Sequence, residues 1–189
     1  MVNLRIEALS VSNLHEFLEY FDHEAFNGSN EKWDGCYCQF YLNSAERNDA
    51  IKANPTTKAA INRSDACTRV ETGKMQGYLA FDGDQVVGWN LAGESLLFPE
   101  VPEANETLAR MLCFVIHPKR RGEGIASAML AHAIDDLRIR GFAAIEAAPY
   151  KTAENFESNY RGTVSMFEKA GFVQVADMGD FGLLMRLEF

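Results

Sequence analysis

The sequence predicts an α/β fold (α+β in the stricter usage), with helices on both faces of a mixed, mostly antiparallel sheet of six to seven strands. Three observations predict this fold class. Short apolar or alternating segments bounded by turn residues are typical of strands. The Asp82-Gly83 bend between two such segments is typical of an antiparallel hairpin. The succession of strand, helix and strand over residues 107–148 requires a crossover and therefore predicts a parallel pair.

The N-terminal part of the chain combines one strand pattern with several helical ones. Residues 3–9 alternate apolar and polar side chains, which predicts a first strand. Ser12 is a candidate N-cap for the amphipathic segment that follows it. Residues 33–42 are rich in aromatic side chains and cysteine, and their conformation stays open. Residues 44–73 have a helical pattern, which we expect Pro55 to interrupt.

The central part of the chain contains the strands that make the sheet mixed. Residues 76–81 and 86–92 form the predicted hairpin, and residues 107–116 form the next strand. Residues 125–139 have an apolar stripe at helical spacing and end before a glycine, which predicts a helix. Residues 142–148 are apolar and predict a strand parallel to residues 107–116.

The C-terminal part completes the sheet. Residues 149–160 read as a polar loop, and residues 163–170 as a short helix. Residues 172–176 and 181–189 are the last two predicted strands. Because the chain contains no linker, repeat or low-complexity segment, we expect a single domain over residues 1–189.

Composition and net charge exclude several classes of function. Hydrophobic residues make up 47% and charged residues 24% of the 189 residues, as in an ordinary soluble globular protein. No apolar run approaches the roughly 18 residues that a membrane span needs, and the N-terminus lacks the apolar core of a signal peptide. A net charge of −9 argues against a nucleic-acid binder, which must neutralise phosphates. We therefore expect neither membrane nor nucleic acid as a partner.

The four cysteines, without an export signal, are typical of reduced thiols and predict a cytoplasmic protein. Cys36 and Cys38 are separated by one residue, which is tighter than the usual zinc knuckle, and no second Cys or His pair accompanies them. We therefore expect no metal.

A local basic segment contrasts with the overall acidity. Residues 119–140 contain five cations and three anions, and such a spot on an acidic chain favours a small anionic ligand over a polyanion. Gly122 and Gly124 lie between a strand and a helix, where they allow close approach of the backbone to an anion. The start of a helix offers unpaired N–H groups and a positive dipole end. Together with Lys119, Arg120 and Arg121, these features predict a diphosphate site built mainly from the main chain.

A dinucleotide is the first of two cofactor classes that fit such a site. The segment from Gly122 to Ser127 is close to the dinucleotide fingerprint, and Glu146 lies about 20 residues further on, where an acidic ribose ligand is expected. Against this reading, Pro118 and three cations separate the glycines from the preceding strand, and the chain has one βαβ unit where several are expected.

Residues 107–172 resemble the GNAT superfamily of acyl-CoA N-acetyltransferases. The resemblance rests on a strand that ends before Pro118, on the segment Arg121-Gly-Glu-Gly124-Ile-Ala126 opening a helix, and on the segment Phe167-Glu-Lys-Ala-Gly171-Phe172 closing a short one. The hairpin that contains Val87-Gly88-Trp89 also lies where the family has its second and third strands.

The resemblance implies that strand 107–116 splays from strand 142–148 and leaves a wedge of open backbone. It implies acetyl-CoA as co-substrate, with the pantetheine arm along the backbone of Phe114, Val115 and Ile116. The diphosphate is then expected on the amides of Arg121, Gly122, Glu123, Gly124, Ile125 and Ala126. The acceptor amine enters from the opposite side of the wedge, so that catalysis is mainly positioning.

The familiar proton-transfer residues of the family are missing. Phe167 stands where many members have a general-acid Tyr, and Arg110 stands where some have a general-base Glu. Tyr160 aligns with an Asn that often contacts the cofactor. We nominate two catalytic candidates. Glu146 is either a proton relay or a member of an ion pair at the strand end, and Tyr160 is either a donor to the thiolate or an exposed loop residue.

The residues between the first strand and the hairpin cover the acceptor in the family fold. By this resemblance, Cys36, Tyr37 and Cys38 are candidates to line the acceptor pocket, and Trp33 or Trp89 are candidates to contribute to it. A role of Cys38 as acyl-carrying nucleophile requires an adjacent base, which the sequence does not identify.

The resemblance predicts transfer of an acetyl group from acetyl-CoA to a primary amine of an unidentified small molecule or protein, by direct attack in a ternary complex. The acidity of the chain suggests a cationic acceptor such as a polyamine. The family allows a homodimer, although no residue marks an interface. Three alternatives stay open: a non-catalytic acyl-CoA binding or sensing module, a nicotinamide-dependent oxidoreductase, and a structural domain.

Overall fold

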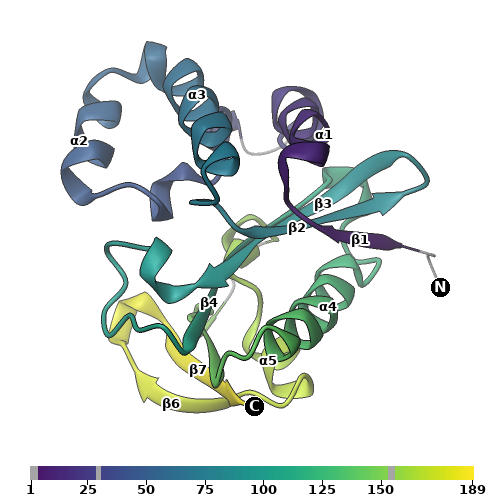
Figure 1. The fold of residues 1–189 in the computed structure, drawn as a ribbon, viewed down its shortest axis with the longest axis vertical. Coiled ribbons are helices and arrows are strands. Elements are labelled where there is room, and N and C mark those ends of the chain that lie inside the picture. Colours follow the sequence, from purple (N-terminus) through teal and green to yellow (C-terminus); the bar gives the residue numbers. More distant parts are fainter. Residues whose placement is uncertain (1–3, 29–30, 153–155) are drawn as a thin grey trace.

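A seven-stranded sheet forms the centre of the computed structural model, which describes residues 4–28, 31–152 and 156–189 (Figure 1). The strand order is β1-β2-β3-β4-β5-β7-β6. Every neighbouring pair is antiparallel except β4 and β5, which are parallel. The strands are β1 (Arg5–Ala8), β2 (Gly77–Asp82), β3 (Gln85–Glu94), β4 (Leu108–Ile116), β5 (Ala144–Ala147), β6 (Val173–Asp177) and β7 (Leu183–Glu188). The fold class that the sequence predicts is confirmed.

Helices cover both faces of the sheet (Figure 1). Leu79 and Trp89 pack on one face with α1 and α3, whereas Tyr78 and Ala80 pack on the other face with α4 and α5. Neighbouring strand residues point to opposite faces, so one strand serves both cores. The helices are α1 (Leu14–Glu19), α2 (Ala45–Ala53), α3 (Lys58–Glu71), α4 (Ile125–Ile139) and α5 (Val164–Lys169). No helix within the described ranges combines the length and the apolar character needed to cross a lipid bilayer.

Helix α4 has the bounds that the sequence predicts. Its apolar stripe is at most 2% exposed and consists of Ile125, Met129, Ala133 and Leu137. Gly141 follows the helix with φ +87°, a left-handed conformation that ends helices and that residues with a side chain rarely adopt. The first residue of α4 therefore lies where the predicted diphosphate site needs a helix start.

The predicted start of the first helix is wrong by one residue, because α1 begins at Leu14 and Asn13 is its N-cap. Ser12 is not the N-cap, because the chain enters a 3-10 turn (Val11–Asn13) after Ser10. The backbone N–H of Ser10 donates to Asn13 Oδ1 over 2.8 Å, which fixes this entry. Strand β1 begins at Arg5, and residues 1–3, which include the start of the predicted strand, lie outside the described residues.

Two segments contain short 3-10 helices that the sequence did not predict. Within residues 149–160, which the polar composition predicts to be loop, Phe156–Arg161 form such a helix. Residues 153–155 of that loop lie outside the described residues. Within residues 33–42, whose conformation stayed open, Gln39–Tyr41 form another. One-turn helices leave no periodic pattern that sequence reasoning can detect.

Strand β5 ends earlier than β4, and this difference opens the sheet. The parallel pairs run from Leu108 with Ala144 to Met111 with Ala147, and β4 continues for five residues beyond Met111. Pro149 follows β5 closely and lacks the N–H that a further ladder bond requires. Within the described ranges, the second half of β4 therefore has no strand beside it on this side, as the resemblance predicts.

Candidate active site

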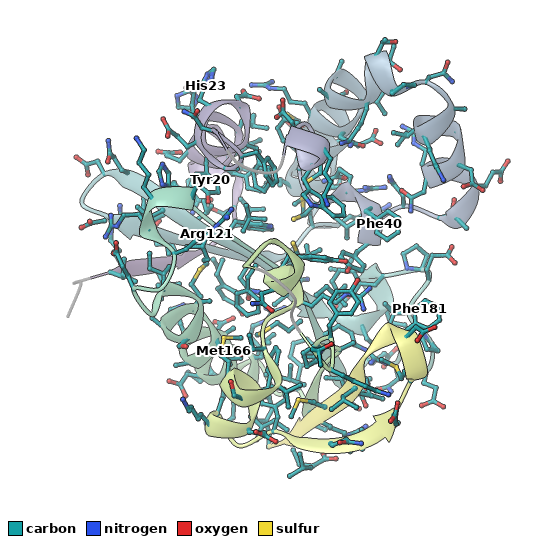
Figure 2. The ribbon with its side chains drawn as sticks, turned by 180° about the vertical axis from the view of Figure 1, so that it is seen from behind. Tyr20, His23, Phe40, Arg121, Met166 and Phe181 are labelled. Atoms are coloured by element: carbon teal, nitrogen blue, oxygen red, sulfur yellow. The ribbon has the colours of Figure 1, made fainter. Side chains whose placement is uncertain are left out.

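A cleft of about 1130 Å³ lies where β4 extends beyond β5. One half, here the α4 half, is bordered by Cys113–Ile116 of β4 and by residues 120–122 and 124–127. The other, here the α3 half, is bordered by turns within residues 32–41 and by α2 and α3. In Figure 2, Arg121 marks the α4 half and Phe40 marks the α3 half. The cleft thus joins the predicted diphosphate site to a second space across the splayed strands.

The turn into α4 forms a cradle of main-chain amides, defined here as residues 121–127. Gly122 and Gly124 have φ values of +82° and +83°, and no atom lies within 4 Å of a Cβ added to either residue. Within the described part of the chain, no hydrogen bond reaches the backbone N–H groups of residues 122–127. These residues, apart from Glu123, line the cleft. A diphosphate site of open amides requires this geometry.

The cations at the cradle differ in their hydrogen-bond partners and in whether they line the cleft. Arg120 donates to Glu123 and Asp82, each over 2.8 Å, and these hydrogen bonds raise the pKa of its guanidinium. Arg121 donates from Nε to the carbonyl oxygen of Ile116 over 3.3 Å, which ties the cradle to the end of β4. Lys119 lies outside the lining of the cleft. Both guanidinium groups border the cleft, and the carboxylates of Glu123 and Asp82 offset the charge of Arg120.

The wall of the α4 half is the exposed edge of β4. Phe114, Val115 and Ile116 all line the cleft, as the resemblance predicts for residues that follow a pantetheine arm. The carbonyl oxygen of Val115 accepts a hydrogen bond from the buried Tyr20 hydroxyl over 3.0 Å. Burial raises the pKa of Tyr20, so this hydroxyl stays protonated and donates. A carbonyl oxygen has two lone pairs and can accept a second hydrogen bond from a ligand.

Two of the cysteines border the α3 half. Cys36 and Cys38 line the cleft, whereas Tyr37 does not and instead donates its hydroxyl to Asp22. The Cys38 sulfur lies 3.4 Å from that of Cys113, and burial raises the pKa of Cys38 well above its ordinary value. Cys38 is therefore a buried neutral thiol, and this environment does not supply the adjacent base that a nucleophilic role requires.

Three tyrosines and an arginine surround the passage between the halves. The Tyr160 hydroxyl lies 3.1 Å from that of Tyr150, and the Tyr160 ring contacts Trp33 with 5.5 Å between centroids. Arg161 donates to the Tyr41 hydroxyl over 3.2 Å and lies over the Tyr150 ring. Burial is the largest cause that raises the pKa values of Tyr41 and Tyr150. The next cause is the electrostatic interaction with Tyr160 for Tyr41 and the hydrogen bond with Tyr160 for Tyr150. Tyr160 therefore belongs to a hydroxyl cluster that lines the cleft.

Glu146 lies in a buried ion triad outside the lining of the cleft. Its carboxylate pairs with Arg110, its direct neighbour in the β4–β5 register, and with Arg186 over 3.0 Å. Arg110 also donates to the carbonyl oxygen of Pro102 over 2.7 Å. This arrangement supports the ion-pair interpretation of Glu146, because two guanidinium groups already bind its oxygens. The predicted proton relay from Glu146 has no contact with the cleft in this structure.

A family model of the acetyltransferase (GNAT) domain matches residues 74–174, just over half of the chain. The chain belongs to the GNAT family of acetyltransferases. The matched residues include the hairpin, β4, α4, β5 and α5, and therefore the cradle and the splayed strands. The family assignment from the sequence motifs is confirmed, and acetyl transfer with acetyl-CoA as co-substrate is the general reaction. A search of curated proteins finds no match to the chain.

Solved structures of acetyltransferases share the fold along nearly the whole chain. PaiA N-acetyltransferase from Thermoplasma acidophilum, solved with coenzyme A, is 15% identical over 99% of both chains, with a TM-score of 0.58. YncA from Salmonella typhimurium, solved with acetyl-CoA, is 15% identical over 98% of this chain and 93% of its own, with a TM-score of 0.53. Ribosomal-protein-alanine N-acetyltransferase from Brucella melitensis is 19% identical over 98% and 99%, with a TM-score of 0.54. At these identities the likeness supports the fold alone.

The GNAT motif at α5 contributes to the core of this member. Phe167, where many members have a tyrosine, is fully buried and packs on Phe114 and Phe172 with ring centroids 6.5 and 5.1 Å apart. It has no group that donates a proton. The phenolic hydroxyl groups in the described lining of this GNAT cleft come instead from Tyr41, Tyr150 and Tyr160.

Sequence reasoning missed Tyr41, Tyr150 and Arg161. One signal for Tyr150 and Arg161 was available, because both lie near the carboxyl end of β5, where ligands bind in sheets with parallel strands. Tyr41 lies more than a hundred residues away from them in the sequence, and only the fold brings it near Arg161. Trp89, which we considered for the acceptor pocket, is fully buried and does not line the cleft.

Proposed function

We propose that this GNAT acetyltransferase transfers the acetyl group to a primary amine by direct attack in a ternary complex. The observation that carries the proposal is the continuity of the cleft. One space joins the open amides of the cradle, the exposed edge of β4 and the α3 half. A thioester on one side and an amine on the other therefore meet beside β4, and their alignment is the main source of catalysis.

The cradle would bind the diphosphate of acetyl-CoA. Its open amides and the dipole of α4 favour negative charge there, and Arg121 adds a formal charge. The backbone of Phe114, Val115 and Ile116 would align the pantetheine arm as an added strand. PaiA and YncA, which share the fold, were solved with coenzyme A and acetyl-CoA, respectively. The general site of acyl-CoA in this chain is therefore proposed at the α4 half.

Tyr160 would supply the proton that the reaction needs at sulfur. The amine nitrogen forms a bond to the thioester carbon, an amide of β4 holds the resulting oxyanion, and the carbon–sulfur bond then breaks. Tyr160 donates its proton to the leaving thiolate and recovers one through the Tyr150 hydroxyl, while the amine loses its proton to water. Arg161 and Tyr41 position this cluster across the cleft. We do not assign Glu146 to this step, because its carboxylate is bound by two arginines.

The release of free CoA from acetyl-CoA, measured over a panel of primary amines, tests the proposal. We expect release that depends on the amine and an acetylated product of matching amount.

A second candidate function is favoured by Phe167 and Arg110, which replace two proton-transfer residues of the family. This candidate is a module that binds acyl-CoA without catalysis. Binding of CoA without release on any amine would support that module and contradict the enzyme.

A cytoplasmic location, a single domain over residues 1–189 and a homodimer stay predictions. The absence of a metal also stays a prediction. None of them enters the argument for acetyl transfer.

A further inference from the structure

The described lining of the cleft carries more cationic than anionic side chains, although the chain has a net charge of −9. Among the described residues, six cationic side chains line it: Lys32, Lys52, Lys58, Arg120, Arg121 and Arg161. The described lining contains one carboxylate, that of Asp49. Charge that lines a cleft acts on a ligand at short range, and the net charge of the whole surface acts weakly through solvent. The ligands of this cleft are therefore expected to be anionic.

Two of these cations belong to the α4 half, where we propose that the phosphates of acetyl-CoA bind. Arg120 and Arg121 flank the cradle in the α4 half. The other cations come from elements that border the α3 half or the passage: the turn at Lys32, helix α2 at Lys52, the start of α3 at Lys58, and the segment before α5 at Arg161. In the described lining of this part of the cleft, these four cations outnumber the one carboxylate, that of Asp49. A diphosphate bound in the cradle does not explain this excess of positive charge.

No carboxylate neutralises these four cations in the described structure. Lys58 Nζ donates to the main-chain oxygens of Lys32 and Asp34 over 3.3 and 2.7 Å. Arg161 donates to the hydroxyl of Tyr41 and to the carbonyl oxygen of Phe181. All of these partners are neutral. By contrast, Arg47 and Arg63, which do not line the cleft, and Arg120, which lines its α4 half, each pair with a carboxylate.

The α3 half also offers a polar acceptor and an aromatic wall. Asn62 is 5% exposed, donates from Nδ2 to the carbonyl oxygen of Gly35 over 2.8 Å, and lines the cleft. Its Oδ1 is buried and has no hydrogen-bond partner within the described residues, an arrangement that costs free energy unless a ligand supplies a donor. Trp33 and Phe40 line the same half with 37% and 61% of their surfaces exposed.

We infer that the acceptor amine carries a carboxylate and an apolar side chain, as an amino acid with a free α-amino group does. The lysines bind the carboxylate, the aromatic wall takes the apolar side chain, and Asn62 Oδ1 accepts from the amine. The inference rests on the proposed function, since it places the acceptor in the α3 half. It differs from the cationic acceptor suggested by the overall acidity, because the acceptor meets the lining of the cleft and not the whole surface.

Binding of two matched compounds tests the inference without turnover. N-acetylphenylalanine and N-acetylphenethylamine differ only in the carboxylate. CoA binding is measured first by titration calorimetry, and each compound is then titrated into the protein saturated with CoA. We expect the carboxylate compound to bind at least tenfold more tightly and its affinity to fall as salt is added. Equal affinity of the two compounds would overturn the inference, whereas failure of CoA to bind would overturn the proposed function instead.

A variant pair assigns the preference to the lysines. The double variant Lys32→Gln, Lys52→Gln removes two charges from the lining, and we expect it to reduce the preference for the carboxylate compound to threefold or less. The control is Lys74→Gln, at an exposed lysine that does not line the cleft, and we expect it to keep the full preference. CoA affinity is measured for each variant. A preference that survives in the double variant contradicts the assignment.

Turnover gives a second readout with another matched pair. Phenylalanine and phenylalaninamide both carry the α-amine and the ring, and only phenylalanine has a carboxylate. With kcat/KM expressed per free amine, we expect phenylalanine to exceed phenylalaninamide and the polyamine spermidine by at least tenfold. CoA release that is faster with spermidine would overturn the inference and leave the proposed acetyl transfer intact.

Discussion

The two halves of the cleft are built on different principles. The α4 half consists of main-chain amides at one helix start and of the backbone of one strand, which is continuous with it in the sequence. The α3 half consists of side chains from the turns within residues 32–41, from helices α2 and α3, and from the segment before α5. A main-chain site depends on local conformation, and a side-chain site depends on how distant elements pack. This difference would suit the α4 half to a co-substrate shared by the family and the α3 half to a particular acceptor, as proposed above.

The largest expected effect comes from blocking the main-chain amides of the α4 half. Gly124→Val places a branched side chain where no protein atom lies within 4 Å and where phosphate oxygens are expected to approach. We expect CoA affinity to fall on the order of 1,000-fold, equivalent to about 4 kcal/mol of binding free energy. Titration calorimetry of CoA with the variant measures this change.

A matched control separates backbone strain from loss of the site. Gly141→Val sits at the other end of α4, where φ is also left-handed and where an added Cβ also meets open space. Both substitutions carry a similar conformational penalty, on the order of 1–3 kcal/mol of folding stability. We expect Gly141→Val to keep the affinity for CoA. Equal loss of affinity in both variants would mean that Gly124 acts through helix stability alone.

The next largest effect tests whether Glu146 belongs to either half. Glu146→Gln leaves the buried Arg110 with a neutral partner in place of a carboxylate. We expect the free energy of unfolding to fall by about 3 kcal/mol, as for other broken buried ion pairs, with turnover per folded molecule unchanged. Thermal unfolding and the amine-dependent rate are measured together, with the exposed Glu188→Gln as control. A lower rate at unchanged stability would restore the proton relay.

A third change addresses the passage between the halves. Tyr160→Phe removes one hydroxyl from the cluster and keeps the ring contact with Trp33. We expect kcat to fall about 100-fold, which is the lower range for loss of a general acid, while CoA affinity stays the same. Tyr150→Phe is the control and should cost less, because Tyr160 keeps its own proton. An unchanged kcat in Tyr160→Phe would exclude it as the donor.

The smallest expected effect comes from an ion pair that holds together the elements of the α3 half. Asp22, in the segment Tyr20–Glu24 that follows α1, accepts hydrogen bonds from Arg63 of α3 and from Tyr37, and so ties that segment to α3 and to the turn that holds the cysteines. Burial raises the pKa of Asp22, but the hydrogen bonds from Arg63 and Tyr37 outweigh burial and lower it below its ordinary value. We expect Asp22→Asn to reduce stability by about 1 kcal/mol.

The pH dependence of this loss follows from the direction of the shift. A carboxylate whose folded pKa lies below its unfolded value stabilises the fold above the unfolded pKa, and it loses that contribution as pH falls through the folded pKa. The difference between Asp22→Asn and the parent chain is therefore constant near neutral pH and shrinks below about pH 4. Urea unfolding at several pH values measures it. A difference that grows toward low pH would contradict the assigned direction.

The sequence predicted the main-chain half because its signals are local. The apolar stripe fixed α4 to its observed bounds, and Gly122 and Gly124 marked the turn before it. The side-chain half was less predictable. Cys36 and Cys38 were expected in the lining from the family resemblance, whereas Tyr41 and Arg161 meet only through long-range packing. The pairing of Arg110 with Glu146 required the strand register, which a single sequence does not specify.

We propose that the amides of the cradle bind the diphosphate of acetyl-CoA. A crystal structure of the protein soaked with acetyl-CoA tests it most directly. We expect diphosphate oxygens within hydrogen-bonding distance, about 2.7–3.2 Å, of the backbone nitrogens of Gly122 and Gly124, with the thioester beside β4. Acetyl-CoA bound elsewhere, with those nitrogens facing only solvent, would contradict it.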